Sequence, residues 1–477
     1  MASSYQQQQD SYKTHRIPLF GNPNNRLASA TKDQLFYNMI FDVITNSVTN
    51  SKTIYCQKRG AFVASSTPDA DGGTGRGIYY WARSGKTYSV IDAVVYSNTT
   101  SIHTLSTSTG TCWFHEATGS SDVLIIGDGT DLLTISTSDT VTDISDGDLP
   151  ATPITPVSLD GYVFVIKSGT DEIYNSDVDA PTAWTASNFL TAEMYPDNLI
   201  ALARHVNYVV AFGLYSTEVF YDNENASGSP LRRNESITLK VGLAARDTMA
   251  QSDKHILFVG QSNTGESSVW ALTGLTPEKV STEFQDKVLT NEGSNLTNAT
   301  ANIIRHRGHS LYVLNLNART LVYDITEKIW SEWSINSSGA HAVLPFKYFT
   351  QGANNTILAL HSTDGKIYQL DPAQHQDDAG AILAWIITSK VDLGTNKQKR
   401  QFNATLIADI ESAGTCTIEW SDDDYGSWKT ARTLDLTIRP FTKAGGIFRR
   451  RAYRIKHASN NPLRLEALEI DCSEGVH

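Results

Sequence analysis

Short runs of apolar residues alternate with turn-forming residues along most of the chain. The stretch DGYVFVIKSGTDEIYNSDVDAPTAW, residues 160–184, is typical, because two runs rich in Val, Ile, Phe and Tyr flank a Ser-Gly-Thr-Asp turn. Branched and aromatic side chains favour strands, and Gly, Asp and Ser favour the turns between them. This stretch therefore predicts a β-hairpin, followed by a polar segment that ends at Trp184.

The same unit recurs along the chain. Hairpins are predicted over residues 77–92, 122–136, 160–184, 207–222, 255–274, 310–333 and 356–372. Their starts lie roughly 40 to 55 residues apart, the length of one four-stranded propeller blade. Stacked blades bury faces that one blade leaves open, and a closed ring removes most free strand edges. The pattern predicts a β-propeller of six or seven blades, since the first hairpin can also belong to the preceding segment. Unrelated hairpins in a large β-sandwich are the alternative.

The repeat stops near residue 380, which divides the chain into three parts. Residues 1–65 mix short apolar runs with turns and predict an N-terminal arm that packs on another part, and residues 66–380 predict the propeller. Residues 381–477 predict a C-terminal β-sandwich. The strands expected there are FNATLIADI, TCTIEWSDD, SWKTARTLDL, FRRRAYRIKH and PLRLEALEID. The predicted fold class is therefore all-β.

Charge is distributed unevenly along the chain. The 477 residues include 39 Lys+Arg and 51 Asp+Glu, a net charge of −12. From residue 385 onward, 14 basic and 12 acidic residues give +2, so the first 384 residues carry 25 basic and 39 acidic residues, a net of −14. Such an acidic segment attracts nucleic acid poorly. We see no secretion signal and no apolar run of membrane-spanning length, so we expect no membrane anchor and folding in a reducing cytoplasm.

Candidate chemistry is sparse. The cysteines form no closely spaced pair that would indicate zinc or a disulfide framework: Cys56, Cys112, Cys416 and Cys472. His306 and His309 lie in a predicted turn, where we expect them to be exposed rather than ligands. No phosphate loop and no nucleophile elbow occurs. We expect no catalytic residues, no metal and no cofactor.

Two short patterns resemble sialidases, which are also propellers. SDDDYGSW, residues 421–428, resembles their Asp-box turn, and Arg16-Ile17-Pro18 resembles their Arg-Ile-Pro. The glycine lies one residue late, the pattern occurs once and outside the repeat, and an Asp box is a structural turn. A sialidase-like glycosidase stays an alternative. A cytoplasmic propeller scaffold of the kelch type is another, although its Gly-Gly doublets are absent from the repeats.

Two basic clusters lie in the part of the chain that is not acidic. Their members are Lys397, Lys399, Arg400, Arg449, Arg450, Arg451 and Arg454. A solvated surface, or salt bridges to Asp422–Asp424, would account for them. The functional alternatives are docking onto an acidic partner surface and contact with passing nucleic acid. We predict partner docking.

The order of these parts resembles the tail hub, or nozzle, of short-tailed (podovirus-type) bacteriophages, also called the packaged-DNA stabilisation protein. In the arm the resemblance is carried by Asp33-Gln34, Asn38 and Lys58-Arg59-Gly60. In the repeat it is carried by residues 160–184, 189–222 and 308–333, and at the end by EWSDDDYGSWKTART and RRRAYRIKHASNNPLRLEALEIDC. Agreement is weak between residues 93 and 150, and the polar extension MASSYQQQQDSYK departs from the pattern.

The resemblance implies a structural role without catalytic residues. Such proteins form a homo-hexamer, a sixfold ring below the portal and the tail adaptor (head-to-tail connector) protein. The arm and C-terminal domain form the platform, and the propellers form a tube. The ring closes the capsid after packaging and conducts viral dsDNA during ejection, with tail needle, plug, tailspike or fibre proteins nearby. The implied location is the virion tail, after assembly in the host bacterial cytoplasm.

Overall fold

The computed structural model describes residues 12–20, 34–45, 52–119, 121–225, 227–263, 265–429 and 431–475. The chain forms two compact units, and neither is one continuous segment. The first unit comprises Met1–Ala61, Ile329–Ala342 and Pro372–His477, and the second comprises Phe62–Lys328 and Val343–Asp371. The sequence predicted boundaries after residues 65 and 380 and left 329–342 inside the propeller. The structure instead places the N-terminal and C-terminal segments in one unit, together with residues 329–342.

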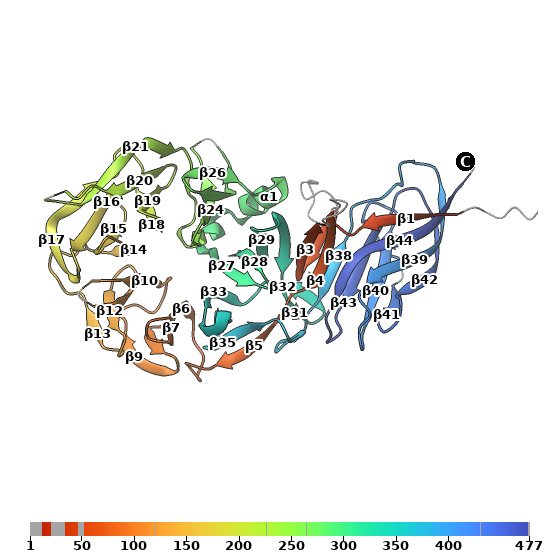
Figure 1. The fold of residues 1–477 in the computed structure, drawn as a ribbon, viewed down its shortest axis with the longest axis horizontal. Coiled ribbons are helices and arrows are strands. Elements are labelled where there is room, and N and C mark those ends of the chain that lie inside the picture. The colour runs from red at the N-terminus through yellow and green to blue at the C-terminus, as the bar shows by residue number, and fades with distance from the viewer. Residues whose placement is uncertain are drawn as a thin grey trace, which may run out of the picture. The chain divides into compact units, whose positions relative to one another are not determined.

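The second unit is a β-propeller. Five of its sheets are formed by consecutive strands (Figure 1). The first three are β6 (Gly75–Trp81), β7 (Lys86–Ile91), β8 (Val94–Ser97) and β9 (Thr100–Thr104); β10 (Trp113–Ala117), β11 (Val123–Gly127), β12 (Leu132–Ser136) and β13 (Val141–Asp143); and β14 (Pro153–Leu159), β15 (Tyr162–Lys167), β16 (Glu172–Asp177) and β17 (Ala180–Thr191). The next two are β18 (Leu199–His205), β19 (Tyr208–Gly213), β20 (Thr217–Asp222) and β21 (Leu231–Leu239); and β22 (Gly242–Leu243), β24 (His255–Gln261), β25 (Ser268–Thr273) and β26 (Thr276–Lys279), with β23 (Ala250–Gln251) paired to β24.

Two further sheets complete the ring. One contains β27 (Thr300–His306), β28 (His309–Asn315) and β29 (Thr320–Asp324). The other contains β33 (Phe346–Gln351), β34 (Ile357–His361), β35 (Ile367–Asp371) and β5 (Ala61–Ser66). Strand β33 contacts β6, so the last sheet meets the first. The described part of the second unit therefore contains seven sheets, one for each predicted hairpin, and the first predicted hairpin, β6–β7, belongs to a blade.

Apolar side chains on facing sheets fill the spaces between blades. Val163 and Trp184 of one sheet pack with Ile125 of the preceding sheet, and all three are buried. Phe212 and Phe258 meet in the same way between later blades, with ring centroids 4.9 Å apart. The predicted hairpin strands are therefore apolar on both faces because a neighbouring blade covers each face.

Helical structure is scarce in the described residues. A single α-helix, α1 (Glu283–Glu292), follows β26, and three 3-10 helices occur: η1 (Arg246–Thr248), η2 (Gly293–Asn298) and η3 (Ala353–Asn355). The sequence analysis did not predict α1. Its start nevertheless carries a capping box, in which the Gln285 side chain accepts a hydrogen bond from the Thr282 backbone N–H at 3.1 Å.

The first unit is a β-sandwich, whereas the sequence predicted a sandwich of residues 381–477 alone. One sheet has the order β3 (Met39–Thr45), β4 (Lys52–Lys58), β44 (Arg464–Glu474), β39 (Lys399–Ala408) and β42 (Phe441–Phe448), and β1 (Lys13–Pro18) pairs with β44. The other has the order β30 (Ile329–Trp333), β2 (Leu35–Tyr37), β38 (Ala384–Ile387), β43 (Ala452–His457), β40 (Thr415–Ser421) and β41 (Arg432–Asp435). Two small hairpins are β31 (Ile335–Ser337) with β32 (Ala340–Ala342), and β36 (Gln376–Asp377) with β37 (Gly380–Ala381).

The N-terminal strands are integral parts of this sandwich. Strand β1 runs antiparallel to β44, with Lys13 opposite Cys472. Phe36 and Phe41 join Leu406, Ile418 and other buried side chains in one core between the two sheets. The predicted arm therefore packs on the C-terminal domain. The quoted Asp33, the first residues of the predicted arm and the extension MASSYQQQQDS lie outside the described residues.

Candidate partner-docking surface

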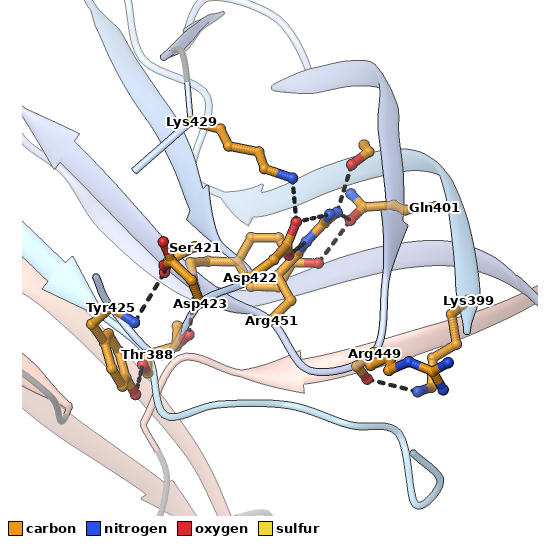
Figure 2. A network of polar contacts seen from close by, with 12 residues as sticks. Thr388, Lys399, Gln401, Ser421, Asp422, Asp423, Tyr425, Lys429, Arg449 and Arg451 are labelled. Carbon is orange, nitrogen blue, oxygen red and sulfur yellow. Dashed lines mark hydrogen bonds and ion pairs between the residues drawn. The ribbon is translucent and has the colours of Figure 1, made fainter. Parts of the chain in front are cut away.

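The fold brings the two predicted basic clusters together in the first unit (Figure 2). Strand β39 begins at Lys399, which lies opposite Phe448 at the end of β42. The residues that follow, Arg449 and Arg450, lead into β43. The Lys399 ammonium donates a hydrogen bond to the Arg449 carbonyl at 2.8 Å, so the clusters touch directly.

Arg451 lies in the interior rather than on a docking surface. Its side chain is fully buried, and its guanidinium donates to both carboxylate oxygens of Asp422, at 2.6 and 2.9 Å. It also donates to the Gln401 side chain and to the Gly445 carbonyl, each at 2.7 Å, and lies over the Phe448 ring at 4.3 Å. All these contacts are intramolecular, so the docking prediction is wrong for Arg451.

Lys399 is also internal, with 1% of its surface exposed. Besides its bond to Arg449, its ammonium donates to the carbonyls of Thr395 and Lys397, at 2.5 and 2.9 Å. These three acceptors match the three protons that an ammonium can donate. Burial lowers the pKa of Lys399. Its charge therefore holds the loop before β39 to the end of β42, and the docking prediction is wrong here as well.

Arg454 occupies an intermediate position on β43. Its guanidinium pairs with Glu419 at 2.5 Å and lies 4.2 Å from the centre of the Trp428 ring. Lys456, two residues along the same strand face, shares Glu419 at 3.1 Å and lies over the Trp385 ring at 4.6 Å. Arg454 is therefore partly neutralised and only partly accessible, with a side-chain exposure of 17%.

Four of the predicted residues are exposed: Lys397, Arg400, Arg449 and Arg450. Arg450 pairs with Asp424 at 3.0 Å, and Arg449 donates to the Asn396 carbonyl at 2.9 Å. Exposed ion pairs contribute only about 0–1 kcal/mol, so such a pair opens readily when a stronger partner arrives. We call these four residues the basic rim. The docking prediction stays a prediction for the basic rim.

The turn of residues 421–428 positions the acids that meet the arginines. The Asp423 carboxylate accepts hydrogen bonds from the Ser427 N–H at 2.9 Å and the Ser421 hydroxyl at 2.7 Å. Hydrogen bonds from Ser427 and Ser421 hold the pKa of Asp423 well below its usual range. The turn thus presents Asp422 to Arg451 and Asp424 to Arg450. Salt bridges to Asp422–Asp424, the second interpretation of the clusters, are confirmed for these two arginines, and the sialidase-like pattern is a structural turn.

The remaining candidates for chemistry are also structural. The sequence analysis predicted that His306 and His309 are exposed, but both side chains are buried. His309 Nδ1 lies 2.7 Å from an Asp324 carboxylate oxygen. Among the described residues, no three His, Cys, Asp or Glu side chains are grouped so that they could hold a metal ion. All four cysteines are buried and free. No helix in the described ranges is long and apolar enough to cross a membrane.

Comparison with known proteins identifies a family. A family model described as "Bacteriophage P22 Gp10, beta-propeller" matches residues 16–375. No curated protein matches the sequence. The solved structures that resemble the chain include virginiamycin B lyase from Staphylococcus aureus, with 12% identity over 64% of this chain and 97% of the lyase, and a TM-score of 0.41. They also include the N-terminal domain of Nup159, with 6% identity over 71% of this chain and 98% of that domain, and a TM-score of 0.38. Likenesses this weak support no conclusion about activity.

Proposed function

This chain belongs to the family of bacteriophage P22 Gp10 β-propeller proteins, and we propose that within the virion it forms the tail nozzle, or hub. Membership makes it a phage structural protein with a propeller fold. The finer proposal is a homo-hexameric ring below the portal and the tail adaptor protein. This ring closes the capsid after DNA packaging and conducts DNA at ejection. A tail needle or plug, and tailspikes or fibres, would attach nearby.

The observation that carries the proposal is the extent of the family match. It covers residues 16–375, which include the described N-terminal strands and the propeller through β35. The match therefore spans both compact units rather than the propeller alone. An isolated propeller scaffold would not require the N-terminal strands that complete the sandwich.

The charge distribution fits both docking to the adaptor and passage of DNA through the ring. The basic rim lies in the C-terminal part, where the net charge from residue 385 onward is +2. An acidic surface on the adaptor would complement it. The first 384 residues carry −14, so six propellers would form a strongly acidic tube to which DNA phosphates do not adhere.

Quantitative mass spectrometry of gradient-purified particles tests the proposal. We expect the chain to co-purify with phage particles at a fixed ratio, about half that of the portal subunit. A sixfold ring below a portal with twice as many subunits would give this ratio. Recovery of the chain only in the soluble fraction of the lysate would contradict the proposal, and a ratio equal to that of the portal would contradict the sixfold ring.

A further inference from the structure

A cavity of about 630 Å³ lies inside the propeller unit. Every blade contributes to its wall, through β6, β10, β14, β18, β27, β33 and residues 246–253. Its volume falls within the range of small-molecule sites, roughly 300–1,000 Å³. The wall combines aromatic rings with a few charged side chains, the composition typical of a site for a polar ligand.

Two guanidinium groups on this wall have N–H donors that are not used in hydrogen bonds. Arg204, on β18, is exposed and donates Nε to the Val206 carbonyl at 3.3 Å. Arg246, in η1, lies 4.5 Å over the Trp113 ring, and its Nε is 3.6 Å from Asp247, too far for a hydrogen bond. That Nε is buried and has no hydrogen-bond partner within the described residues. An arginine can donate five hydrogen bonds, so both side chains are under-used.

The acidic side chains on the same wall are already engaged. Asp247 accepts hydrogen bonds from the Thr111 hydroxyl at 2.7 Å and the Trp113 indole N–H at 3.2 Å. Glu116 accepts one from the Tyr79 hydroxyl at 2.8 Å. Asp247 also forms the 3.6 Å ion pair with Arg246. The carboxylates are therefore bound to residues of the wall, whereas the two guanidinium groups keep unused N–H donors for a ligand.

Two other groups on the wall could carry a charge near neutral pH, because burial raises the pKa of Tyr79, Cys112 and Tyr348 and keeps these three neutral. Asp253 pairs with Arg305 at 2.9 Å, and both of these side chains are exposed. Burial, with a smaller effect of the Arg204 charge, lowers the pKa of His115 to about 4. His115 is therefore neutral near pH 7 and does not compete as a third cation.

We propose that this cavity binds a small organic anion bearing a carboxylate or a phosphate, held by Arg204 and Arg246. Guanidinium forks pair with both groups through two parallel charge-assisted hydrogen bonds, which are stronger than neutral ones. Asp247 and Trp113 hold Arg246 in place before a ligand arrives, so little side-chain entropy is lost on binding. The inference concerns the propeller alone and holds whether or not the chain forms the nozzle.

Isothermal titration calorimetry on the full chain tests the site, with citrate as the carboxylate probe and inorganic pyrophosphate as the phosphate probe. We expect one probe or both to bind one per chain. Arg204→Gln and Arg246→Gln should each weaken binding about tenfold, the loss expected for one charge-assisted contact. Arg232→Gln, at an exposed position on β21 away from the cavity, is the matched control and should change nothing.

The tighter of the two probes identifies the chemical class of the ligand. If neither anion binds, or if both cavity variants bind as well as the wild type, the proposal is wrong. An equal loss in Arg232→Gln would show binding by overall charge and would also overturn it. Circular dichroism checks that each variant is folded. Should Arg246→Gln unfold, the exposed Arg204 gives the decisive comparison.

Discussion

Arg59 and Asp377 form a bidentate ion pair inside the first unit, with nitrogen–oxygen distances of 2.9 and 2.7 Å. Both side chains are buried, at 0% and 3% exposure. The Arg59 guanidinium also donates to the Asn38 side chain and to the Ser334 carbonyl, each at 2.9 Å. One side chain therefore joins the N-terminal strands, residues 329–342 and the C-terminal segment. This junction ties three distant segments together within the sandwich.

Replacement of Arg59 by Leu should destabilise the first unit strongly. The change leaves the Asp377 carboxylate buried without its counter-ion, which costs about 3–5 kcal/mol. Urea unfolding of the full chain, followed by tryptophan fluorescence, measures the change in the free energy of unfolding. Arg16→Leu is the matched control, because Arg16 is half exposed where it pairs with Glu469, and we expect a loss below about 1 kcal/mol. Equal losses in both variants would contradict the role of the buried pair.

Lys58, the neighbour of Arg59, should make stability depend on pH. It has 1% exposure and donates to the Ser459 carbonyl at 2.9 Å. Burial, and then the Arg59 charge, lower the pKa of Lys58 from 10.5 to about 7. Between these two values the unfolded chain binds more protons than the folded chain, so stability rises with pH from about 7 towards 10. Lys58→Met should raise the free energy of unfolding at pH 7 and flatten this rise.

Denaturant titrations at pH 7, 8 and 9 check the Lys58 prediction. Lys443→Met, at an exposed position of β42 in the same unit, is the control and should keep the wild-type slope. A rise with pH that persists unchanged in Lys58→Met would show that another group causes it.

Sequence patterns predicted the parts of the fold that depend on local chemistry. Each hairpin combines apolar strands with a turn, and the hairpin expected over residues 122–136 forms as β11 and β12, with Asp128 and Gly129 between the two strands. Gly129 has a positive φ of 92°, which a glycine adopts readily. Pairings between distant segments could not be predicted, because no local signal shows that β5 joins β35 or that residues 329–342 join the sandwich. The start of helix α1 could have been predicted, because Thr282 and Gln285 have the spacing of a capping box.

The basic clusters show the same limit at the level of a site. Along β39 the side chains alternate between the two faces, so Lys399 points inward and Arg400 outward. The sequence shows two neighbouring cations but not which one is buried. The inward position depends on acceptors from distant segments, such as the Arg449 carbonyl for Lys399 and Asp422 for Arg451. Proximity in sequence therefore revealed the cluster, and only the tertiary fold separated rim from interior.

Closure of the propeller should depend on Phe62 in β5. Its side chain is 1% exposed and packs on Phe346 of β33, with ring centroids 4.4 Å apart. Phe62→Ala should cost about 3–5 kcal/mol because it leaves a cavity in the last blade. Hydrogen exchange should accelerate in peptides that cover β34 and β35. Phe189→Ala is the control, since Phe189 is 40% exposed, and unchanged exchange in Phe62→Ala would contradict the closure.

The acidic charge of the propeller should prevent DNA from adhering to the ring during ejection. Reversal to Lys of acidic residues on the loops that face the lumen of the ring should slow ejection, because phosphates would then adhere to the tube. Ejection kinetics of assembled particles, followed with a DNA-binding dye, measure the effect. The slowing of ejection in the reversed particles should become weaker as the salt concentration is raised. Normal ejection kinetics in the reversed particles would count against an electrostatic conduit.

The basic rim should be required for assembly but not for folding. A variant with Arg449→Ala and Arg450→Ala removes two exposed cations, so we expect the free energy of unfolding to change by less than about 1 kcal/mol. Attachment to adaptor-bearing particles should fall at least tenfold, as measured by sedimentation of the bound chain. The matched variant Arg451→Ala removes a buried cation from the same run and should unfold the sandwich instead. Attachment at the wild-type level by the folded double variant would place docking elsewhere on the chain.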